Sequence, residues 1–259
     1  MKNKILTQPR LALLLLAICS MLLDCKKREI ENLDNLIADG CIPQTIIINE
    51  PIFGESQNDF IYENDRLVTG FNNYNYEYKN GMVKRIRLGD NRYEDYLYND
   101  DCKVIQSIQY RRDDPDEDFN VINDKQYEYN GELIFKVIDN TKNLTHEISY
   151  YPNTNNIDSI KTLNDNLELI ELNLFQYDQS NNVYKNLLMP KFNFYWWIEK
   201  NSNNNITQRK IIKFTNPIVT LIYNYEFVYN NYNYPIEINM LETSSNYYSN
   251  TTITYLGCM

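Results

Sequence analysis

The sequence predicts an all-β protein: an antiparallel meander of hairpins that forms a strongly curved sheet or a partly closed barrel. Apolar and polar side chains alternate with a period of two from Ile46 onward. Asn80-Gly81 and Asn130-Gly131 lie between such stretches and are typical of two-residue hairpin turns. The chain has 23 tyrosines, which favour strands, and only seven glycines. The pattern gives about a dozen or more short strands, which is too many for one flat sheet, and closure would also remove exposed edges.

The chain begins with the pattern of a secretion signal. Lys2, Lys4 and Arg10 form a basic start, and residues 11–23 are apolar apart from Ser20. A membrane-spanning helix needs about 20 apolar residues, so this run is too short to remain in a bilayer. We therefore expect residues 1–24 to be a signal peptide that is removed after export.

Cys25 directly follows this segment and precedes two lysines. The arrangement resembles the signal of a bacterial lipoprotein, in which the cysteine sulfur is lipidated and becomes the new N-terminus. Acyl chains contribute about 0.8 kcal/mol per buried CH₂, so several chains hold a soluble domain at a membrane. We expect lipidation at Cys25, with residues 25–45 as lipidated N-terminus and tether. Cys19 is the weaker alternative site, and an ordinary cleaved secretion signal is the alternative to lipidation.

The mature chain is strongly acidic. Removal of residues 1–24 takes away three positive charges and Asp24, which leaves 22 positive against 34 negative side chains, a net charge of −12. Nucleic-acid binding depends on Lys and Arg that neutralise phosphates, so we expect no nucleic-acid partner. The remaining length suits one large β domain, which we place at residues 46–259.

The alternation assigns faces to individual strands. Tyr74, Tyr76 and Tyr78 are predicted to share one face, opposite Asn75, Glu77 and Lys79, and Ile86 and Leu88 alternate with Arg85 and Arg87. A tyrosine ring can pack while its hydroxyl stays in contact with water, so we expect a thin, half-buried sheet. Charged residues in these strands are predicted to lie on the wet face.

A loose unit recurs along the chain: an aromatic residue, any residue, a tyrosine, a few turn residues and an aliphatic pair. The clear copies are Phe60-Ile61-Tyr62 with Leu67-Val68, Tyr76-Glu77-Tyr78 with Met82-Val83, Tyr96-Leu97-Tyr98 with Val104-Ile105, and Tyr127-Glu128-Tyr129 with Leu133-Ile134. Degenerate copies are Ile148-Ser149-Tyr150, Phe175-Gln176-Tyr177-Asp178 and Phe227-Val228-Tyr229-Asn230. The repeated unit is one hairpin, irregularly spaced.

These hairpins are similar to YD (tyrosine-aspartate) repeats, with Tyr177-Asp178 and Lys185-Asn186-Leu187 as further points of likeness. The chain, over roughly residues 46–256, resembles Bacteroidetes-type YD-repeat lipoproteins, a domain of unknown function with a porin-like fold. The resemblance implies a meandering sheet that curls towards a barrel and implies no ligand or catalytic residue. A membrane pore is disfavoured, because many strands carry Asn, Glu, Lys or Arg where lipid would require an apolar band.

Three cysteines remain in the mature chain besides Cys25: Cys41, Cys102 and Cys258. At most one disulfide can form among them. A Cys41–Cys258 bond would join the two ends of the domain in an oxidising compartment, but three buried thiols fit the sequence equally well.

Candidate chemical sites are few. His146 is the one histidine, and its neighbours Thr145 and Glu147 favour an exposed strand position. Residues 113–118 hold five carboxylates, which could bind Ca²⁺, but the EF-hand pattern fails and a solvated acidic loop is the expectation. The sequence indicates no pair of glycosidase carboxylates. We therefore expect no catalytic residue, no cofactor and no metal.

The densest aromatic cluster contains the candidate ligand-binding residues Tyr195, Trp196 and Trp197. Flat rings can stack on sugar faces, and adjacent tryptophans in a strand point to opposite sides. Core packing is the alternative reading. We expect an outer-membrane lipoprotein, facing the periplasm or the cell surface, that is a non-enzymatic binding module for a glycan or an envelope protein. The alternatives are a structural component of an envelope complex and, less favoured, a carboxylate-based glycan hydrolase.

Overall fold

Sixteen antiparallel strands close into one barrel in the part of the chain that the structure, a computed structural model, describes: residues 41–63, 67–71, 74–79, 82–184, 202–256 and 258. The strands are β1 (Ile42–Glu50), β2 (Gly54–Glu63), β3 (Leu67–Phe71), β4 (Tyr74–Lys79), β5 (Met82–Leu88), β6 (Arg92–Tyr98), β7 (Val104–Arg111), β8 (Asn120–Asn130), β9 (Leu133–Asp139), β10 (Leu144–Tyr150), β11 (Ile157–Leu163), β12 (Leu169–Asn181), β13 (Asn204–Lys213), β14 (Val219–Tyr229), β15 (Pro235–Glu242) and β16 (Tyr247–Leu256).

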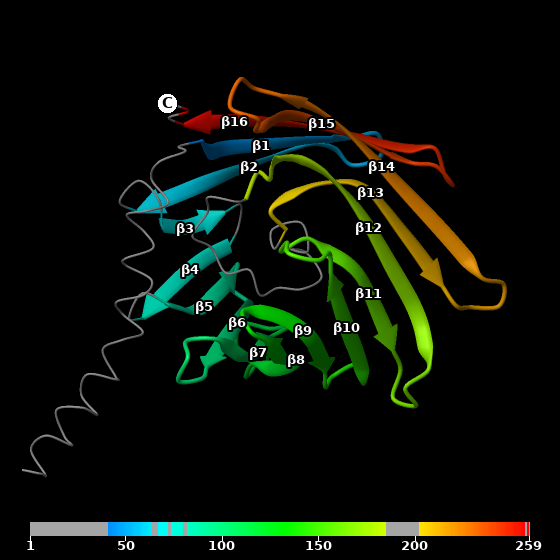
Figure 1. Cartoon of the computed structure of the whole chain (residues 1–259). Coiled ribbons are helices and arrows are strands. Elements are labelled where there is room, and N and C mark those ends of the chain that lie inside the picture. The colour runs from blue at the N-terminus through cyan, green and yellow to red at the C-terminus, as the bar shows by residue number, and fades with distance from the viewer. Residues whose placement is uncertain are drawn as a thin grey trace, which may run out of the picture.

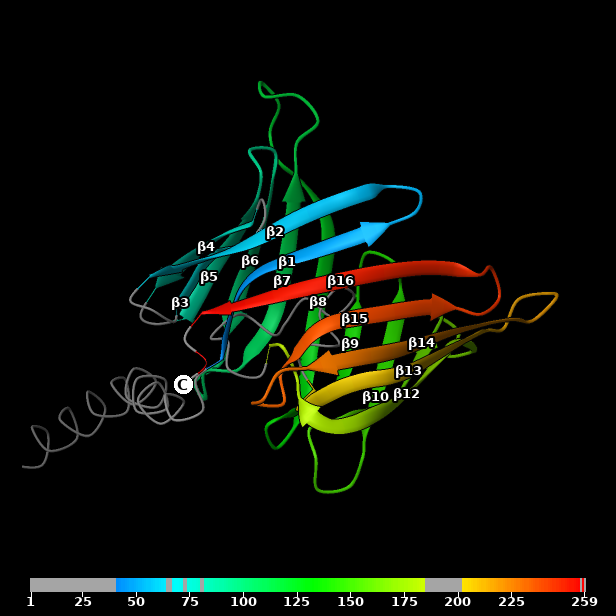
Figure 2. The same ribbon diagram turned by 90° about the horizontal axis from the view of Figure 1, so that it is seen from above.

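Each strand pairs with its neighbours in sequence, and β1 pairs with β16. Figure 1 shows the strands following one another around the barrel, and Figure 2 shows β2, β1, β16, β15, β14 and β13 side by side across the seam. The predicted antiparallel meander is confirmed. Of the two predicted forms, a curved sheet and a partly closed barrel, the structure shows a barrel that is fully closed. β1 begins at Ile42, earlier than the predicted start of the domain at residue 46. The described residues form no helix long and apolar enough to cross a bilayer.

The two Asn-Gly pairs differ in their turns. Lys79 pairs with Met82, so a two-residue loop joins β4 and β5 as predicted, although Asn80 and Gly81 lie outside the described residues. Asn130 instead pairs with Leu133, and Gly131 is the first loop residue, with a φ of 58°. The second turn is therefore shifted by one residue, because the glycine supplies the positive φ and the asparagine remains in the strand.

The first residue of each repeated unit faces the barrel interior. The buried members are Phe60, Tyr76, Tyr96, Tyr127, Ile148 and Phe175. Hydrophobic burial at about 25 cal/mol per Å² makes this layer a main source of stability. The predicted faces are correct here, since Tyr76 and Ile86 are buried while Asn75, Lys79 and Arg87 are exposed.

The second tyrosine of each unit also points inward and is partly buried. We call these residues the tyrosine ring: Tyr62, Tyr78, Tyr98, Tyr129, Tyr150, Tyr177, Tyr229 and Tyr255. A register shift occurs directly before seven of the eight, as between Leu97 and Tyr98, and opposite Tyr255 it falls in β1. β-Bulges of this kind increase twist and bend the sheet, so one bulge per hairpin at the same level promotes closure.

Six ring hydroxyls donate to backbone carbonyls of the neighbouring hairpin. The bonds are Tyr62–Pro43 (2.5 Å), Tyr78–Val68 (2.7 Å), Tyr98–Val83 (2.7 Å), Tyr129–Val104 (3.0 Å), Tyr150–Ile134 (2.8 Å) and Tyr255–Pro235 (2.7 Å). In every case the acceptor residue is the register partner of the adjacent ring tyrosine. The expectation of wet hydroxyls is wrong for these residues, because the hydroxyl reaches a carbonyl inside the barrel wall.

The outer face of the barrel is polar in the middle of its strands. Neighbouring strands carry hydrogen-bonded or charged pairs there: Thr45–Asp59, Arg85–Asp95, Gln106–Asp124, Glu128–Lys136, Gln208–Asn224 and Asn239–Asn250. A barrel that spans a bilayer needs an outward apolar band about 25 Å tall. The described outer wall has no such band, since these pairs interrupt it on most strands.

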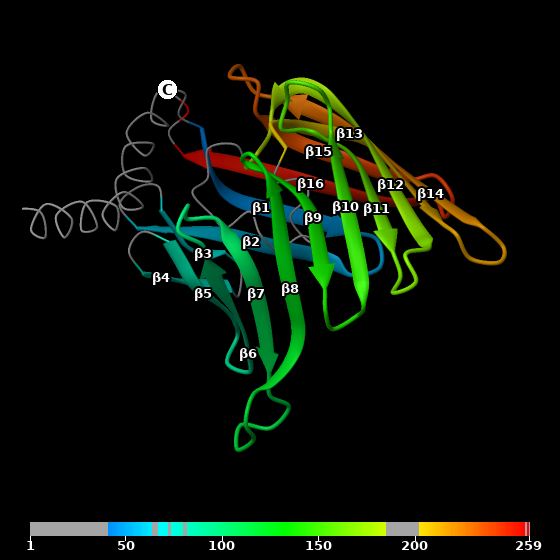
Figure 3. The same cartoon turned by 60° about the horizontal axis from the view of Figure 1, so that its bottom comes forward.

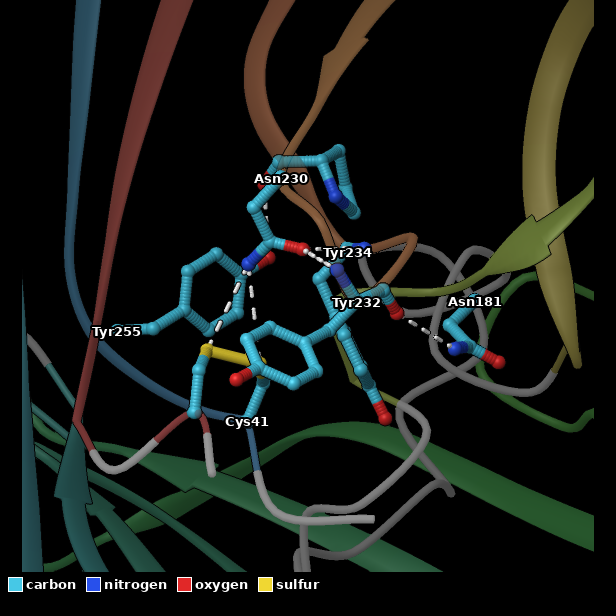
Figure 4. The surroundings of a disulfide bond; sticks show 8 residues. Cys41, Asn181, Asn230, Tyr232, Tyr234 and Tyr255 are labelled. Carbon is cyan, nitrogen blue, oxygen red and sulfur yellow. Dashed lines mark hydrogen bonds between the residues drawn. A yellow bond between two sulfur atoms is a disulfide. The ribbon is translucent and has the colours of Figure 1, made fainter.

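A disulfide joins Cys41 and Cys258 beside the β1–β16 seam. The side-chain amide of Asn230 lies against both sulfur atoms, 3.7 Å from Cys41 Sγ and 3.5 Å from Cys258 Sγ. The oxygen of the same amide accepts the backbone N–H groups of Tyr232 and Tyr234 (Figure 4). The bond between the two ends of the domain, one of the alternatives that the sequence left open, is therefore formed. Cys102 is disulfide-bonded as well, so the expectation of at most one disulfide is wrong.

Candidate functional site

A cluster of ionisable side chains lies on the inner wall of β6, β8, β9 and β10. Glu94, Lys125, Asp139 and His146 are all at most 4 % exposed. Lys125 stands directly opposite Ser107 on β7 and Asp139 on β9 in the strand register. Residues paired in this way have Cβ atoms about 5 Å apart. The sheet therefore brings together charges that are far apart in the sequence.

His146 joins the cluster from β10. It pairs with Val137 on one side and with Thr162 on the other, and its Nδ1 lies 3.0 Å from Thr162 Oγ1. The predicted exposed position is wrong, because Thr145 and Glu147 take the outer face and leave His146 inside. Burial and the positive charge of Lys125 lower the pKa of His146 to about 4, so the imidazole is neutral at pH 7.

The charges of Glu94 and Lys125 compensate each other in part. Burial raises the pKa of Glu94, and the positive charges of Lys125 and Arg92 oppose that shift. Burial likewise lowers the pKa of Lys125, against the attraction of Glu94 and Asp139. Desolvation is the larger effect on both groups, as expected for charges removed from water. Asp139 also accepts the backbone N–H of Lys142 at 2.9 Å.

Other polar side chains on the inner wall are hydrogen-bonded in pairs. The hydroxyls of Ser107 and Tyr127 lie 2.9 Å apart, and Arg92 donates to Gln109 at 2.6 Å. Further along the same inner wall, Arg209 donates to Asn173 at 2.9 Å. Buried polar groups that are bonded in this way fix the register of the strands that carry them.

The cluster contains two buried carboxylates, Glu94 and Asp139. A glycosidase needs two carboxyl groups on either side of a bond that the substrate presents to them. Glu94 and Asp139 are instead 4 % and 0 % exposed and both interact with Lys125. Their arrangement favours a charge-balanced element of the barrel wall over a substrate site. The sequence did not predict this cluster of buried charges, because a charged residue in an alternating strand was expected to face water.

The acidic segment 113–118 is an exposed loop between β7 and β8, as predicted (Figure 3). Asp113 pairs with Arg111, and Arg112 donates to the carbonyl of Pro115 at 2.8 Å. Asp114 Oδ1 accepts the backbone N–H of Asp116 at 3.0 Å. Within the described ranges, no group of three or more His, Cys, Asp or Glu is placed to hold a metal ion.

The candidate lipidation site Cys25 and the candidate ligand-binding residues Tyr195, Trp196 and Trp197 lie outside the described residues. The structure does place the chain on either side of residues 185–201. Val183 and Ser202 are buried, and Ser202 donates to the hydroxyl oxygen of Tyr177 in the tyrosine ring at 3.0 Å. The described residues on both sides of this stretch, between β12 and β13, therefore lie close to the tyrosine ring.

Amide side chains connect the described residues on the two sides of this stretch. Asn156 accepts the backbone N–H groups of Asn203 and Asn204 and donates to the Asn204 side chain at 2.9 Å. Asn182 donates to the carbonyl of Asn204 at 3.1 Å. Asn205 donates its side-chain amide to Asp178 and to the carbonyl of Asn181. The runs of Asn in the sequence were the available signal, although they were not predicted to form a network.

Asp178, the acidic residue of the Tyr-Asp pair, accepts the hydroxyl of one ring tyrosine in place of a backbone carbonyl. It accepts the hydroxyl of Tyr229 together with the backbone N–H groups of Ser180 and Asn205. Burial and this carboxylate raise the pKa of Tyr229. The series of hydroxyl-to-carbonyl bonds is thus altered at Tyr177 on β12 and Tyr229 on β14, the two strands that flank β13.

Comparison with known proteins supports the fold. Among solved structures the chain is similar to a porin-like protein from Bacteroides vulgatus ATCC 8482, with a TM-score of 0.58 and 11% identity over 84% of this chain and 99% of that chain. A porin-like protein from Bacteroides uniformis ATCC 8492 aligns at 12% identity over 83% of this chain and 98% of its own, with a TM-score of 0.27. No protein-family model matches the chain, and no curated protein matches it in sequence. The chain thus has a porin-like β-barrel fold.

Proposed function

We propose that the protein is an outer-membrane lipoprotein of the YD-repeat type, held by acyl chains on Cys25, whose barrel stands in water and is a non-enzymatic binding or interaction module. The observation that carries this proposal is the polar outer wall. Arg85–Asp95 and Glu128–Lys136 lie in mid-strand on that wall, where a bilayer would surround a spanning barrel. A charged side chain at that depth costs about 2–4 kcal/mol for Arg or Lys.

The inner wall supports a role without catalysis. The described carboxylate with a raised pKa, Glu94, is buried beside Lys125 and has no open approach for a polymeric substrate. We therefore assign binding to the loops and to the segment that contains Tyr195, Trp196 and Trp197, which lies outside the described residues. The aromatic rings of this segment suit a glycan or an envelope protein. A structural role in an envelope complex is the second candidate, because the polar outer wall also fits contacts with another protein.

Fractionation of cells tests the anchor. The native protein is expected in the membrane pellet after a urea wash, with an N-terminus at Cys25 that carries acyl chains in mass spectrometry. The same chain from Lys26 onward, exported behind a signal with an Ala-x-Ala cleavage site, is expected in the soluble fraction. A version without acyl chains that still resists urea extraction would show a membrane-spanning barrel and overturn the proposal.

Pull-down from a solubilised envelope tests the binding role. The mature protein is expected to retain a glycan or protein component, and Trp196→Ala with Trp197→Ala is expected to reduce that retention. The matched control is Ile52→Ala with Phe53→Ala, two exposed residues in the β1–β2 turn. Equal recovery by all three proteins would remove the tryptophans from the binding site.

A further inference from the structure

Three aromatic rings gather on the outer wall at the base of the acidic loop 113–118. We call the rings of Tyr93, Tyr110 and Phe119 the outer aromatic cluster. Tyr93 on β6 and Tyr110 on β7 are register partners, and Phe119 directly precedes β8 (Figure 3). Asp95, two residues after Tyr93, bonds Arg85 on the outer wall, so strand alternation places both tyrosines on the outer face.

Neighbouring side chains hold the ring of Tyr93 in place. Its ring is stacked against that of Tyr110, with centroids 4.8 Å apart and planes inclined by 22°. Arg85 Cζ lies 4.0 Å from the centroid of Tyr93, and Phe119 meets the same ring edge-on at 4.8 Å. Arg85 and Tyr110 come from the strands on either side of β6. Tyr93 is therefore packed on both sides, and it supports Tyr110 from one side.

The second face of Tyr110 is open. No other ring and no cation of the described chain packs on Tyr110. Its register partner on β8, Val121, is 54 % exposed, so the wall beside it lies in water. A flat ring that is held on one face and free on the other presents a stacking surface.

Polar groups surround this stacking surface. The hydroxyls of Tyr93 and Tyr110 have no hydrogen-bond partner among the described residues, whereas six hydroxyls of the tyrosine ring donate to carbonyls. Burial and the neighbouring Tyr93 and Asp95 raise the pKa of Tyr110, so its hydroxyl is protonated and can donate at neutral pH. The carboxylate of Asp95 keeps acceptor capacity beyond the two bonds that it receives from Arg85.

The charges around the outer aromatic cluster are already paired with one another. The pairs are Arg85–Asp95, Arg87–Glu77 and Arg111–Asp113. An anionic ligand would have to displace a carboxylate from an arginine, and it would meet the five carboxylates of the acidic loop. An acyl chain would remove these charges from water without a new partner, which is costly. The surroundings therefore favour a neutral ligand that has both an apolar face and hydroxyl groups.

A sugar ring has these properties, because its C–H groups form an apolar face and its hydroxyls lie around the edge. We propose that the outer aromatic cluster is a binding site for a neutral polysaccharide, with a sugar ring stacked on the open face of Tyr110. Sugar hydroxyls accept from the Tyr110 hydroxyl and donate to Asp95. The inference rests on the proposed binding role and gives it a site on the outer wall, apart from the segment with Trp196 and Trp197.

Affinity electrophoresis of the mature protein in a detergent without a sugar headgroup tests this site. The native gels contain dextran, laminarin, mannan or xylan, and one gel contains anionic polygalacturonate. At least one neutral polymer is expected to retard the native protein. Tyr110→Ala is expected to weaken that binding about tenfold, because the stacking surface is lost. Tyr248→Ala, at an exposed tyrosine on β16, is the matched control and should bind as the native protein does.

A second variant tests the site without removal of a ring. Val121→Arg puts a guanidinium where it can cover the open face of Tyr110, as Arg85 covers Tyr93. The substitution lies at an exposed position, so folding should be little affected. We expect it to weaken the retardation to a similar extent. Unchanged circular dichroism is the control for folding, and Val121→Arg decides alone where Tyr110→Ala does not fold.

Three results would overturn the inference. The first is a native protein that no neutral polymer retards, or that polygalacturonate alone retards. An envelope protein whose retention depends on Tyr110 would then be the ligand of this face. The second is equal retardation of the native protein and Val121→Arg. The third is binding that Trp196→Ala with Trp197→Ala abolishes and Tyr110→Ala leaves unchanged, which moves the site to that segment and keeps the proposed binding role.

Discussion

The hydroxyl of Tyr98 donates a 2.7 Å hydrogen bond to the carbonyl oxygen of Val83, and Val83 is the residue that pairs with Tyr78 in the preceding hairpin. The same relation links Tyr129 to Val104 and therefore to Tyr98. Each hairpin is thus fastened to the preceding one by a side chain as well as by the strand ladder. The repeated tyrosine has a structural role that alternation alone does not reveal.

Replacement of Tyr98 by Phe is expected to lower the free energy of unfolding by about 1 kcal/mol, because the partly buried carbonyl of Val83 loses its donor. Urea denaturation followed by tyrosine fluorescence measures the change. Tyr232→Phe, at an exposed turn position, is the matched control and should leave the stability within about 0.5 kcal/mol. Equal effects of the two substitutions would show that the ring hydroxyls do not stabilise the barrel.

Lys125 is expected to be among the most sensitive residues of the inner wall. Lys125→Met leaves Glu94 and Asp139 buried without their shared cation, which should cost about 3–5 kcal/mol. Addition of Glu94→Gln to that variant should recover part of the loss, because one unbalanced charge is removed. Lys161→Met, on the exposed face of β11, is the control. Chemical denaturation of the three variants and the native protein at pH 7 gives the comparison. A Lys125→Met variant as stable as the native protein would contradict the proposed charge balance.

The stability of the protein is expected to fall between pH 6.5 and about 4 because of His146. Its pKa is lowered to about 4 in the fold, so only the unfolded chain takes up the proton over most of this range. The stabilisation is therefore complete above pH 6.5 and is lost as the pH falls. His146→Gln should reduce the difference in unfolding free energy between pH 7 and pH 4.5 by about 2–3 kcal/mol. An unchanged pH dependence in the variant would place the imidazole in contact with water.

The Cys41–Cys258 bond closes a loop of 217 residues. In the chain-entropy account, a crosslink over a loop this long stabilises the folded state by about 5 kcal/mol, because the unfolded chain loses freedom. The double variant Cys41→Ala with Cys258→Ala should therefore unfold at markedly lower urea concentration. An unchanged midpoint would mean that strand pairing at the β1–β16 seam suffices for closure.

The fold class and the strand faces could be predicted because the alternation is local. Tyr76 and Ile86 face inward with their charged neighbours outside, as their sequence positions indicate. Closure could not be predicted, since no local pattern tells whether β1 meets β16 or remains an edge. The same holds for the disulfide, which depends on that seam.

The inner-wall cluster could not be predicted for a different reason. Alternation shows that His146 and Lys125 lie in strands but not that their side of the strand is the interior, because charged residues normally take the wet face. Both point inward here since Glu147 and Gln126 occupy the outer positions. The compensating charges come from Glu94 and Asp139 on other strands, and only the barrel register places them together.

The most direct test of the central claim, that the outer wall of this barrel faces water, is sedimentation of the mature chain without acyl groups in buffer free of detergent. We expect a monodisperse monomer in that buffer, because the polar pairs on β5, β6, β8 and β9 are stable in water. Slow amide hydrogen exchange across these strands is expected to show that the monomer is folded. A chain that is folded only in detergent or lipid, and that aggregates without them, would contradict the claim.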